Sequence, residues 1–296
     1  MLARMLRFTM ALQMMIGAAL GFWLSRGLAP AWTLMNMALA AVALPLAFTV
    51  LADLYSATVS RAQEPAAQWW RALAGECLAG IQVFLLRQPW AFAPPSIEPA
   101  TTAARRIPVV LVHGYVCNYR IWDVLIPDLR AQGHTVLAIN LEPVFASVDD
   151  YAALVEQAVQ SLRSQTGHDK VALVGHSMGG LAIRAWMRRY GTAHVARAIT
   201  LGTPHAGTRI NALIRTPNAL QMAWHSSWLR ELAASETEAT RSLFRTALSP
   251  QDNIVFPQRA QTLEGISPVV FEGLGHVQLC TSGRVRAWVC NELRLT

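Results

Sequence analysis

Residues 170–190 read KVALVGHSMGGLAIRAWMRRY, and this stretch decides the fold. Residues 171–174 form a short apolar run, which is typical of a buried parallel strand. A helical pattern follows as far as Tyr190. Between the two lies GHSMG at 175–179, a G-x-S-x-G pattern at a predicted strand-to-helix turn. In that context the pattern holds a serine hydroxyl above a parallel sheet.

Ser177 has the surroundings of a nucleophile. A serine at so sharp a turn has strained backbone geometry, and flanking glycines remove the Cβ clashes that would prevent it. The hydroxyl then stands at a helix N-terminus, where an oxyanion is electrostatically favoured. The alternative is a glycine-rich turn with an incidental serine, and the strand, the helix and the additional Gly180 argue against it.

The same rhythm of strand and helix continues on both sides of this stretch. Apolar runs at 107–112, 135–139 and 195–201 predict strands, and helices are expected at 121–132 and 147–165. Strands that alternate with helices predict an α/β fold with a mostly parallel sheet flanked by helices. Ligands of such sheets bind beyond the carboxyl ends of the strands.

Five segments resemble the bacterial triacylglycerol lipase and esterase branch of the α/β-hydrolases. In chain order they are VVLVHGY (109–115), VGHSMGG (174–180), LGTPHAGT (201–208), DNIVFP (252–257) and GLGHVQL (273–279). Their order and spacing match that family from residue 107 to the C-terminus, about two-thirds of the chain. The resemblance implies an α/β-hydrolase fold and a serine hydrolase.

A serine hydroxyl needs a base, and in this fold the chain order is serine, acid, histidine. Of the eight histidines only His225 and His276 lie more than thirty residues beyond Ser177. His276 follows a strand-like run at 268–271 and is the expected base. His225 lies in a tryptophan-rich polar stretch and is interpreted as a lid residue.

Asp252 is the expected acid, because it follows a short apolar segment and leads into Ile-Val-Phe-Pro, as in the family. The alternative is a solvated turn aspartate, in which case Glu264 and Glu272 are the other candidates.

Two backbone N–H groups are expected to bind the oxyanion. Met178, directly after the nucleophile, supplies one, and the resemblance places the other at Tyr115. The match is looser there, since Cys117 and Asn118 stand where many relatives have glycine or a small residue.

Residues from about 206 to 248 interrupt the strand–helix rhythm. They predict an apolar helical insertion, either a lid or acyl-binding cap over the active site or ordinary helix packing. The apolar residues concerned are Trp224, Trp228, Leu229, Leu232, Leu243 and Phe244.

The composition excludes several classes of protein. The chain is 53% hydrophobic and 15% charged, with a net charge of +7; the usual charged share is about 25%. The basic residues are scattered, so no nucleic-acid partner is expected, and an anionic bilayer surface explains them more simply. The four cysteines lack metal-ligand spacing, and whether Cys280 and Cys290 form a bridge stays open. We expect no metal or organic cofactor.

The first sixty residues predict a transmembrane helical hairpin. Residues 8–24 and 32–51 carry no charge, and each run is close to the ~20 residues that cross the hydrocarbon core. The alternative for 8–24 is a cleaved signal peptide, although Ser-Arg-Gly is a poor cleavage site. Arg4 and Arg7 favour a cytoplasmic N-terminus.

Residues 69–86 form the one segment that makes the orientation ambiguous. As a third span they would place the catalytic domain outside, but Arg71 and Glu76 argue against a span. An amphipathic helix on the membrane or against the enzyme is expected instead. The predicted location is then the bacterial inner membrane, with the catalytic domain on the cytoplasmic side.

The predicted organisation is a membrane anchor (1–60), an amphipathic helix with a Pro-rich linker (61–104) and an α/β-hydrolase domain (105–296). The predicted function is a membrane-anchored serine hydrolase that cleaves carboxylic esters of lipophilic substrates through an acyl-enzyme. An acyltransferase or thioesterase on the same triad, or a non-catalytic binding protein with this fold, are the alternatives. The sequence does not indicate an oligomeric state.

Overall fold

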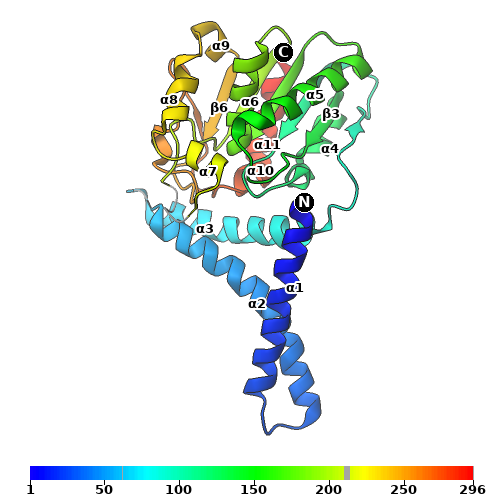
Figure 1. Ribbon diagram of the computed structural model, residues 1–296, viewed down its shortest axis with the longest axis vertical. Coiled ribbons are helices and arrows are strands. Elements are labelled where there is room, and N and C mark those ends of the chain that lie inside the picture. Colours follow the sequence, from blue (N-terminus) through cyan, green and yellow to red (C-terminus); the bar gives the residue numbers. More distant parts are fainter. Residues whose placement is uncertain (62, 210–213, 296) are drawn as a thin grey trace.

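The computed structural model describes residues 1–61, 63–209 and 214–295. An α/β body lies at one end of a long stalk (Figure 1). The stalk is a hairpin of α1 (Leu2–Leu24) and α2 (Pro30–Val59), and α3 (Ala66–Gly80) lies between the stalk and the body. The N-terminus therefore lies beside the body, and the turn between α1 and α2 lies at the far end of the stalk.

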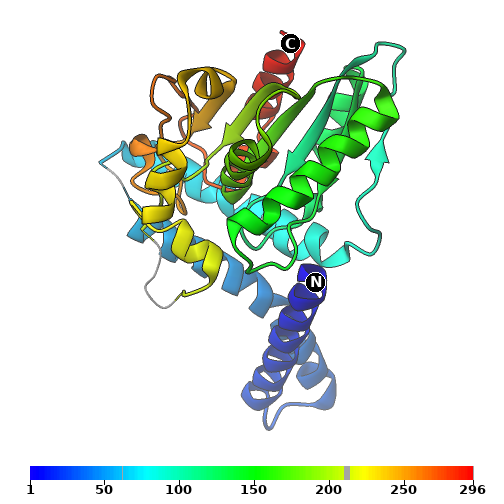
Figure 2. The same cartoon turned by 45° about the horizontal axis from the view of Figure 1, so that its top comes forward.

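The body is built on a seven-stranded sheet of order β1-β3-β2-β4-β5-β6-β7. Among these strands β1 pairs antiparallel with β3, and the other pairs are parallel. The predicted α/β fold with a mostly parallel sheet is confirmed (Figure 2). The strands are β1 (Ile97–Glu98), β2 (Arg106–Val112), β3 (His134–Ile139), β4 (Val171–His176), β5 (Val195–Leu201), β6 (Phe244–Leu248) and β7 (Val269–Val270).

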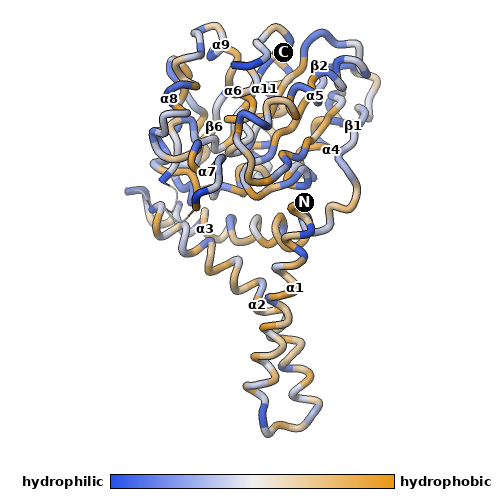
Figure 3. The backbone as a smooth tube through the Cα atoms, viewed as in Figure 1, coloured by the Kyte–Doolittle hydropathy of each residue, from blue (hydrophilic) through white to orange (hydrophobic). Residues whose placement is uncertain are grey.

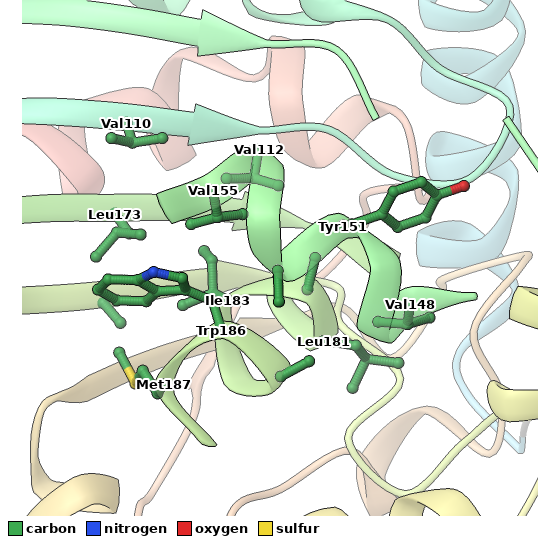
Figure 4. Packing of buried hydrophobic residues seen from close by; sticks show 14 of the residues in the cluster. Val110, Val112, Val148, Tyr151, Val155, Leu173, Leu181, Ile183, Trp186 and Met187 are labelled. Atoms are coloured by element: carbon green, nitrogen blue, oxygen red, sulfur yellow. The ribbon is translucent and has the colours of Figure 1, made fainter. Parts of the chain in front are cut away.

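Helices cover both faces of the sheet. On one face α5 (Val148–Thr166) and α6 (Met178–Tyr190) pack on β2 and β4, and Val155 and Trp186 lie against Val110 and Leu173 (Figure 4). On the other face α4 (Leu125–Ala131) and α11 (Gly283–Arg294) pack on the alternate side chains of the same strands. Side chains of a strand alternate between faces, so one short run supplies both cores.

Helix α3 belongs to the second of these cores. Its residue Ala79, and Val83 in the π-helical continuation η1 (Ile81–Arg87), are buried with Val109 and Leu111 of β2. Residues 69–86 therefore lie against the body, which is one of the two arrangements expected for an amphipathic helix. The 3₁₀ turn η2 (Gln88–Trp90) then ends the segment.

Local signals set several element ends. Ser147 and Asp150 form a capping box at the start of α5, and Gly167 ends the helix with φ of 73°. The helix predicted at 121–132 is instead a 3₁₀ turn, η3 (Tyr119–Trp122), followed by α4. Pro127 explains the break, because its ring would clash with the carbonyl four residues earlier in a continuous helix.

Two strands lie where the sequence analysis predicted no strand. Strand β1 comes from within the Pro-rich segment, so the sheet begins before residue 105. Strand β6 comes from the end of the predicted insertion, where Phe244 is fully buried in the sheet core. The helices of the insertion are α7 (Pro217–Gln221), α8 (Ser227–Ala234) and α9 (Glu238–Ser242), and we call the segment between β5 and β6 the cap.

The remaining short elements lie in the last fifty residues. They are η4 (Gln258–Ala260) and α10 (Gln278–Thr281).

Both stalk helices are long and apolar enough to cross a membrane (Figure 3). Only 11% and 6% of their most hydrophobic windows are buried, so they are not core helices of the body. The length and composition of α1 also fit an N-terminal signal sequence.

The two stalk helices approach closely through small residues. A Cβ on Gly17 would lie 2.3 Å from the Ala40 carbonyl oxygen, and one on Gly21 would lie 2.5 Å from that of Asn36. The spacing Gly-x-x-x-Gly puts both on one face of α1, which allows tight helix packing in an apolar environment. Near the turn, Asn36 Nδ2 also donates to Ser25 Oγ at 2.8 Å.

Substituting Gly17→Val should force the stalk helices apart, because the new side chain would meet backbone that cannot turn away. We expect a cost of about 1–3 kcal/mol and a lower midpoint of thermal unfolding, measured by circular dichroism in detergent. The matched control is Ala19→Val, which places the same side chain at an exposed position of α1. Equal midpoints for the two variants would contradict this packing.

Candidate active site

The turn between β4 and α6 holds Ser177 in a strained conformation. Its φ is +54°, which is rare for a residue with a side chain. A Cβ on Gly175 would lie 2.6 Å from the Gly180 nitrogen, and one on Gly179 would lie 2.1 Å from the Val112 oxygen. Only glycine fits at these two flanking positions, so the turn packs directly against the end of β2.

Backbone hydrogen bonds fix this turn to the neighbouring strand. The Ser177 N–H donates to the Leu201 carbonyl at 2.9 Å, and the Ser177 carbonyl accepts from Thr203 Oγ1 at 2.9 Å. The strain is therefore balanced by partners on β5 and the loop that follows it.

The structure brings His276 and Asp252 together at the same edge of the sheet. Nδ1 of His276 lies 2.7 Å from Oδ2 of Asp252, and both side chains are buried. The other carboxylate oxygen, Oδ1, accepts the N–H groups of Ile254 at 2.9 Å and Val255 at 2.7 Å. Those two bonds fix the plane of the carboxylate, and the carboxylate in turn orients the imidazole.

The pKa of His276 is raised above its usual value of 6.5. Burial is the largest influence and opposes the charged form, but the carboxylates of Asp252 and Glu76 together outweigh it. The imidazole is thus a stronger base than a histidine in water.

The other candidate acids lie elsewhere. Glu264 is exposed and lies 3.5 Å from Arg241 Nη2. Glu272 is exposed and accepts from Gln68 Nε2 at 2.9 Å. His225, the other candidate base, contacts Trp224 in the cap, with ring centroids 4.1 Å apart and the ring planes tilted by 58°. Among these residues only Asp252 contacts His276.

The predicted oxyanion groups lie next to Ser177. Met178 is the first residue of α6, where a backbone N–H has no partner within the helix. A Cβ on Gly114 would lie 2.8 Å from the Ser177 Cβ, so the loop that carries Tyr115 touches the turn of Ser177. The next residue, Val116, has a φ of +52°, a second strained position beside the first.

Three other buried histidines support the loops around the site. His113 Nε2 accepts the Leu141 N–H at 2.9 Å, and burial lowers the pKa of His113 to about 4. His176 Nε2 lies 3.1 Å from the His276 carbonyl oxygen, and His205 Nε2 lies 3.0 Å from Thr200 Oγ1. Burial lowers the pKa of His176 and of His205 as well, so both are neutral hydrogen-bonding groups.

Ser177 and Tyr115 both line a cavity of about 360 Å³. Its walls come from three regions: the end of α2, the cap, and residues 253–256 after Asp252. The lining is mainly apolar. A cap over the active site was one of the two arrangements expected for residues 206–248, whereas no contribution of α2 was expected.

Glu76 on α3 is the residue beside the site that the sequence analysis missed. This buried carboxylate accepts the Val277 N–H through Oε1 and the Gln278 N–H through Oε2, both at 2.9 Å. The loop that carries His276 is thus held from below by a helix two hundred residues earlier. Burial raises the pKa of Glu76 to about 7, although both N–H donors act to lower it. The sequence feature that could have identified Glu76 is its place on the apolar face of an amphipathic helix, where a carboxylate is unusual.

No group of histidine, cysteine or acidic side chains in the part of the chain that the structure describes is arranged to hold a metal ion. The four cysteines are free, so Cys280 and Cys290 are not bridged in this structure.

Sequence comparison matches the chain to the α/β-hydrolase fold and to lipases. The family described as alpha/beta hydrolase fold matches residues 107–249. The chain is 36% identical to a triacylglycerol lipase of Burkholderia plantarii over 129 residues, and 38% identical to one of Pseudarthrobacter phenanthrenivorans over 119 residues. These matches cover 40% and 36% of this chain but only 35% and 36% of the lipases, so the chain matches about a third of their length.

Two solved lipases have the same fold. The mature lipase BlEst2 of Bacillus licheniformis aligns with a TM-score of 0.58 and 16% identity, over 68% of this chain and 98% of that one. Lipase B of Aspergillus fumigatus aligns with a TM-score of 0.55 and 18% identity, over 65% of this chain and 55% of that one. At these identities the likeness concerns the fold.

Substituting Glu76→Gln should loosen the loop that carries His276. The amide keeps one acceptor but turns its NH₂ toward the second N–H donor, leaving a buried group unpaired at a cost of about 1–3 kcal/mol. We expect a lower midpoint of thermal unfolding. Glu272→Gln is the matched control, because it removes the same charge from an exposed site nearby. An unchanged midpoint for Glu76→Gln would show that α3 does not hold this loop.

Proposed function

This chain is an α/β-hydrolase-fold protein with sequence similarity to lipases, and on that premise we propose that it hydrolyses carboxylic esters of lipophilic compounds. The observation that carries the proposal is the buried His276–Asp252 pair, with 2.7 Å between Nδ1 and Oδ2. The ring of His276 lies 4.6 Å, between centroids, from that of His176, the residue before a strained serine that lines an apolar cavity. Fold alone does not decide activity, so the argument rests on this group of side chains.

In the proposed reaction His276 acts as the general base. A hydrogen bond from its Nδ1–H to Asp252 leaves Nε2 unprotonated, and Nε2 takes the proton of the Ser177 hydroxyl as Oγ attacks the acyl carbonyl. The imidazolium then returns that proton to the leaving alcohol as the ester C–O bond breaks. A water molecule, deprotonated by the same Nε2, attacks the acyl-enzyme. The acyl C–Oγ bond then breaks, Nε2 returns the proton to Ser177 Oγ, and the carboxylic acid leaves.

The charge that develops on the carbonyl oxygen needs donors already in place. We assign this role to the backbone N–H groups of Met178 and Tyr115. The place of Met178 as the first residue of α6 and the close approach of Gly114 to Ser177 support that assignment. The strain at Val116 is consistent with a loop held in one conformation for this purpose.

We further propose that the stalk anchors the enzyme in the bacterial inner membrane. Its two exposed apolar helices and the small-residue packing between them support a hairpin in the bilayer. Since the N-terminus lies beside the body, both are on one side of such a membrane (Figure 1). Arg4 and Arg7 favour the cytoplasmic side.

The triad assignment predicts large losses of hydrolysis in single variants. With a soluble short-chain ester, Ser177→Ala and His276→Ala should each lower kcat by about 10⁴-fold or more, and Asp252→Asn should do so by about 10⁴-fold. Glu264→Gln is the control, because the exposed Glu264 lies away from His276. Hydrolysis that survives Ser177→Ala at the wild-type rate would exclude this serine as the nucleophile.

The pH dependence of the same assay separates loss of the base from misfolding. His276 must be neutral to act, so kcat/KM should fall as the pH drops through its pKa, which lies above 6.5. In Asp252→Asn the carboxylate that raises this pKa is absent while burial remains, so the residual activity should fall at a lower pH. If kcat/KM fell at the same pH in wild type and in Asp252→Asn, the assignment of Asp252 and His276 would be contradicted.

A further inference from the structure

We propose that the last two turns of α2 form one wall of the acyl-chain site, so that the enzyme receives bilayer-resident acyl esters directly along its own membrane helix. This inference rests on the proposed function and adds the substrate class and its route. It makes the stalk part of the substrate site as well as an anchor.

The first observation is the position of α2 in the cavity. Tyr55, Ser56 and Val59 line the same cavity as Ser177. Tyr55 and Val59 are nevertheless 66% and 56% exposed, so they stand where the cavity opens. Two further lining residues, Ile214 of the cap and Ile254, are 40% and 44% exposed. We call these four residues the mouth.

Arg209 is the charged residue that also lines the cavity and is exposed, but the four residues of the mouth are apolar or aromatic. Its four side chains are one tyrosine and three aliphatic residues, and exposed apolar patches of this kind mark membrane or ligand contacts. On the face of α2 that carries Tyr55 and Val59, the preceding turns carry the exposed apolar side chains of Phe48 and Leu51. An apolar surface therefore runs from the proposed bilayer segment to the mouth.

The size of the cavity supports the same route. Ligand sites usually measure about 300–1,000 Å³, and this cavity of about 360 Å³ lies near the lower limit. A long acyl chain bonded at Ser177 would extend beyond it. The direction that keeps such a chain away from water passes the mouth and follows α2.

The wall is fixed relative to the catalytic residues. Asn253 Nδ2 donates to Ser56 Oγ at 2.8 Å, while its Oδ1 accepts the His276 N–H at 3.0 Å. One asparagine thus joins α2 to the proposed base. The Ser60 carbonyl accepts from Gln258 Nε2 at 2.9 Å, which holds the end of the helix on the body.

A charge at the mouth tests this account. The full chain, reconstituted in vesicles of phosphatidylethanolamine and phosphatidylglycerol, is assayed with a water-soluble butyrate ester and with a long-chain diacylglycerol in the same bilayer. Val59→Glu should lower the ratio of long-chain to short-chain kcat/KM by about tenfold or more. Thr58→Glu is the matched control, because Thr58 is the exposed neighbour that does not line the cavity, and it should leave the ratio unchanged.

The outcomes separate the route from the activity. An equal ratio in wild type and Val59→Glu, or an equal fall in both glutamate variants, would overturn the proposed wall while leaving ester hydrolysis intact. A folded wild type that hydrolyses neither ester would overturn the proposed function itself.

A second measurement does not depend on the folding of a variant or on turnover. A long-chain ester with a photoreactive diazirine in its acyl chain is placed in the vesicles, and wild-type protein is irradiated and mapped by peptide mass spectrometry. Label in residues 53–61 supports the wall. Its absence there, with or without label in the cap, would overturn it.

Discussion

The turn between β4 and α6 is the constraint on which the rest of the site depends. Its glycines let the helix start in contact with the Val112 carbonyl at the end of β2, and this contact brings the Gly114 loop against Ser177. The positions of Ser177, the loop of Tyr115 and the cavity therefore depend on one close approach between a helix and two strands. A single methyl group at Gly179 would push all of them apart, because the atom it meets is backbone.

The segment before residue 105 contributes to the core of the body and to the support of the site. Ala79 and Val83 are buried in the same core as β2. The Glu76 carboxylate holds the loop of His276, although Glu76 precedes the residues that match the α/β-hydrolase family. Buried carboxylates are costly unless they are hydrogen-bonded, so Glu76 and the two N–H groups depend on each other. Helices α2 and α3 are thus both joined by hydrogen bonds to the loop of the proposed base, α2 through Asn253 and α3 through Glu76.

Local patterns predicted the fold well where one residue decides the outcome. The strand at 195–201, the cap of α5 at Ser147 and its end at Gly167 follow from side-chain branching, a capping box and a left-handed glycine. The single helix predicted at 121–132 was wrong because the prediction followed the apolar pattern and did not take account of Pro127, which interrupts the helix. The contact between Asp252 and His276 agrees with the order of motifs along the chain. The roles of Glu76 and of the end of α2 were not predictable, because their partners lie two hundred residues away in the sequence and only the fold brings them together.

The central claim is that Ser177 is a nucleophile activated by His276, and covalent labelling tests it most directly. Detergent-solubilised wild type is treated with a fluorophosphonate probe beside Ser177→Ala, Asp252→Asn and His276→Ala, and the site of attachment is mapped. The account predicts one adduct, on Ser177, which is absent in Ser177→Ala and strongly reduced in His276→Ala. A folded wild type that never reacts, or one whose adduct lies on another residue, would contradict it.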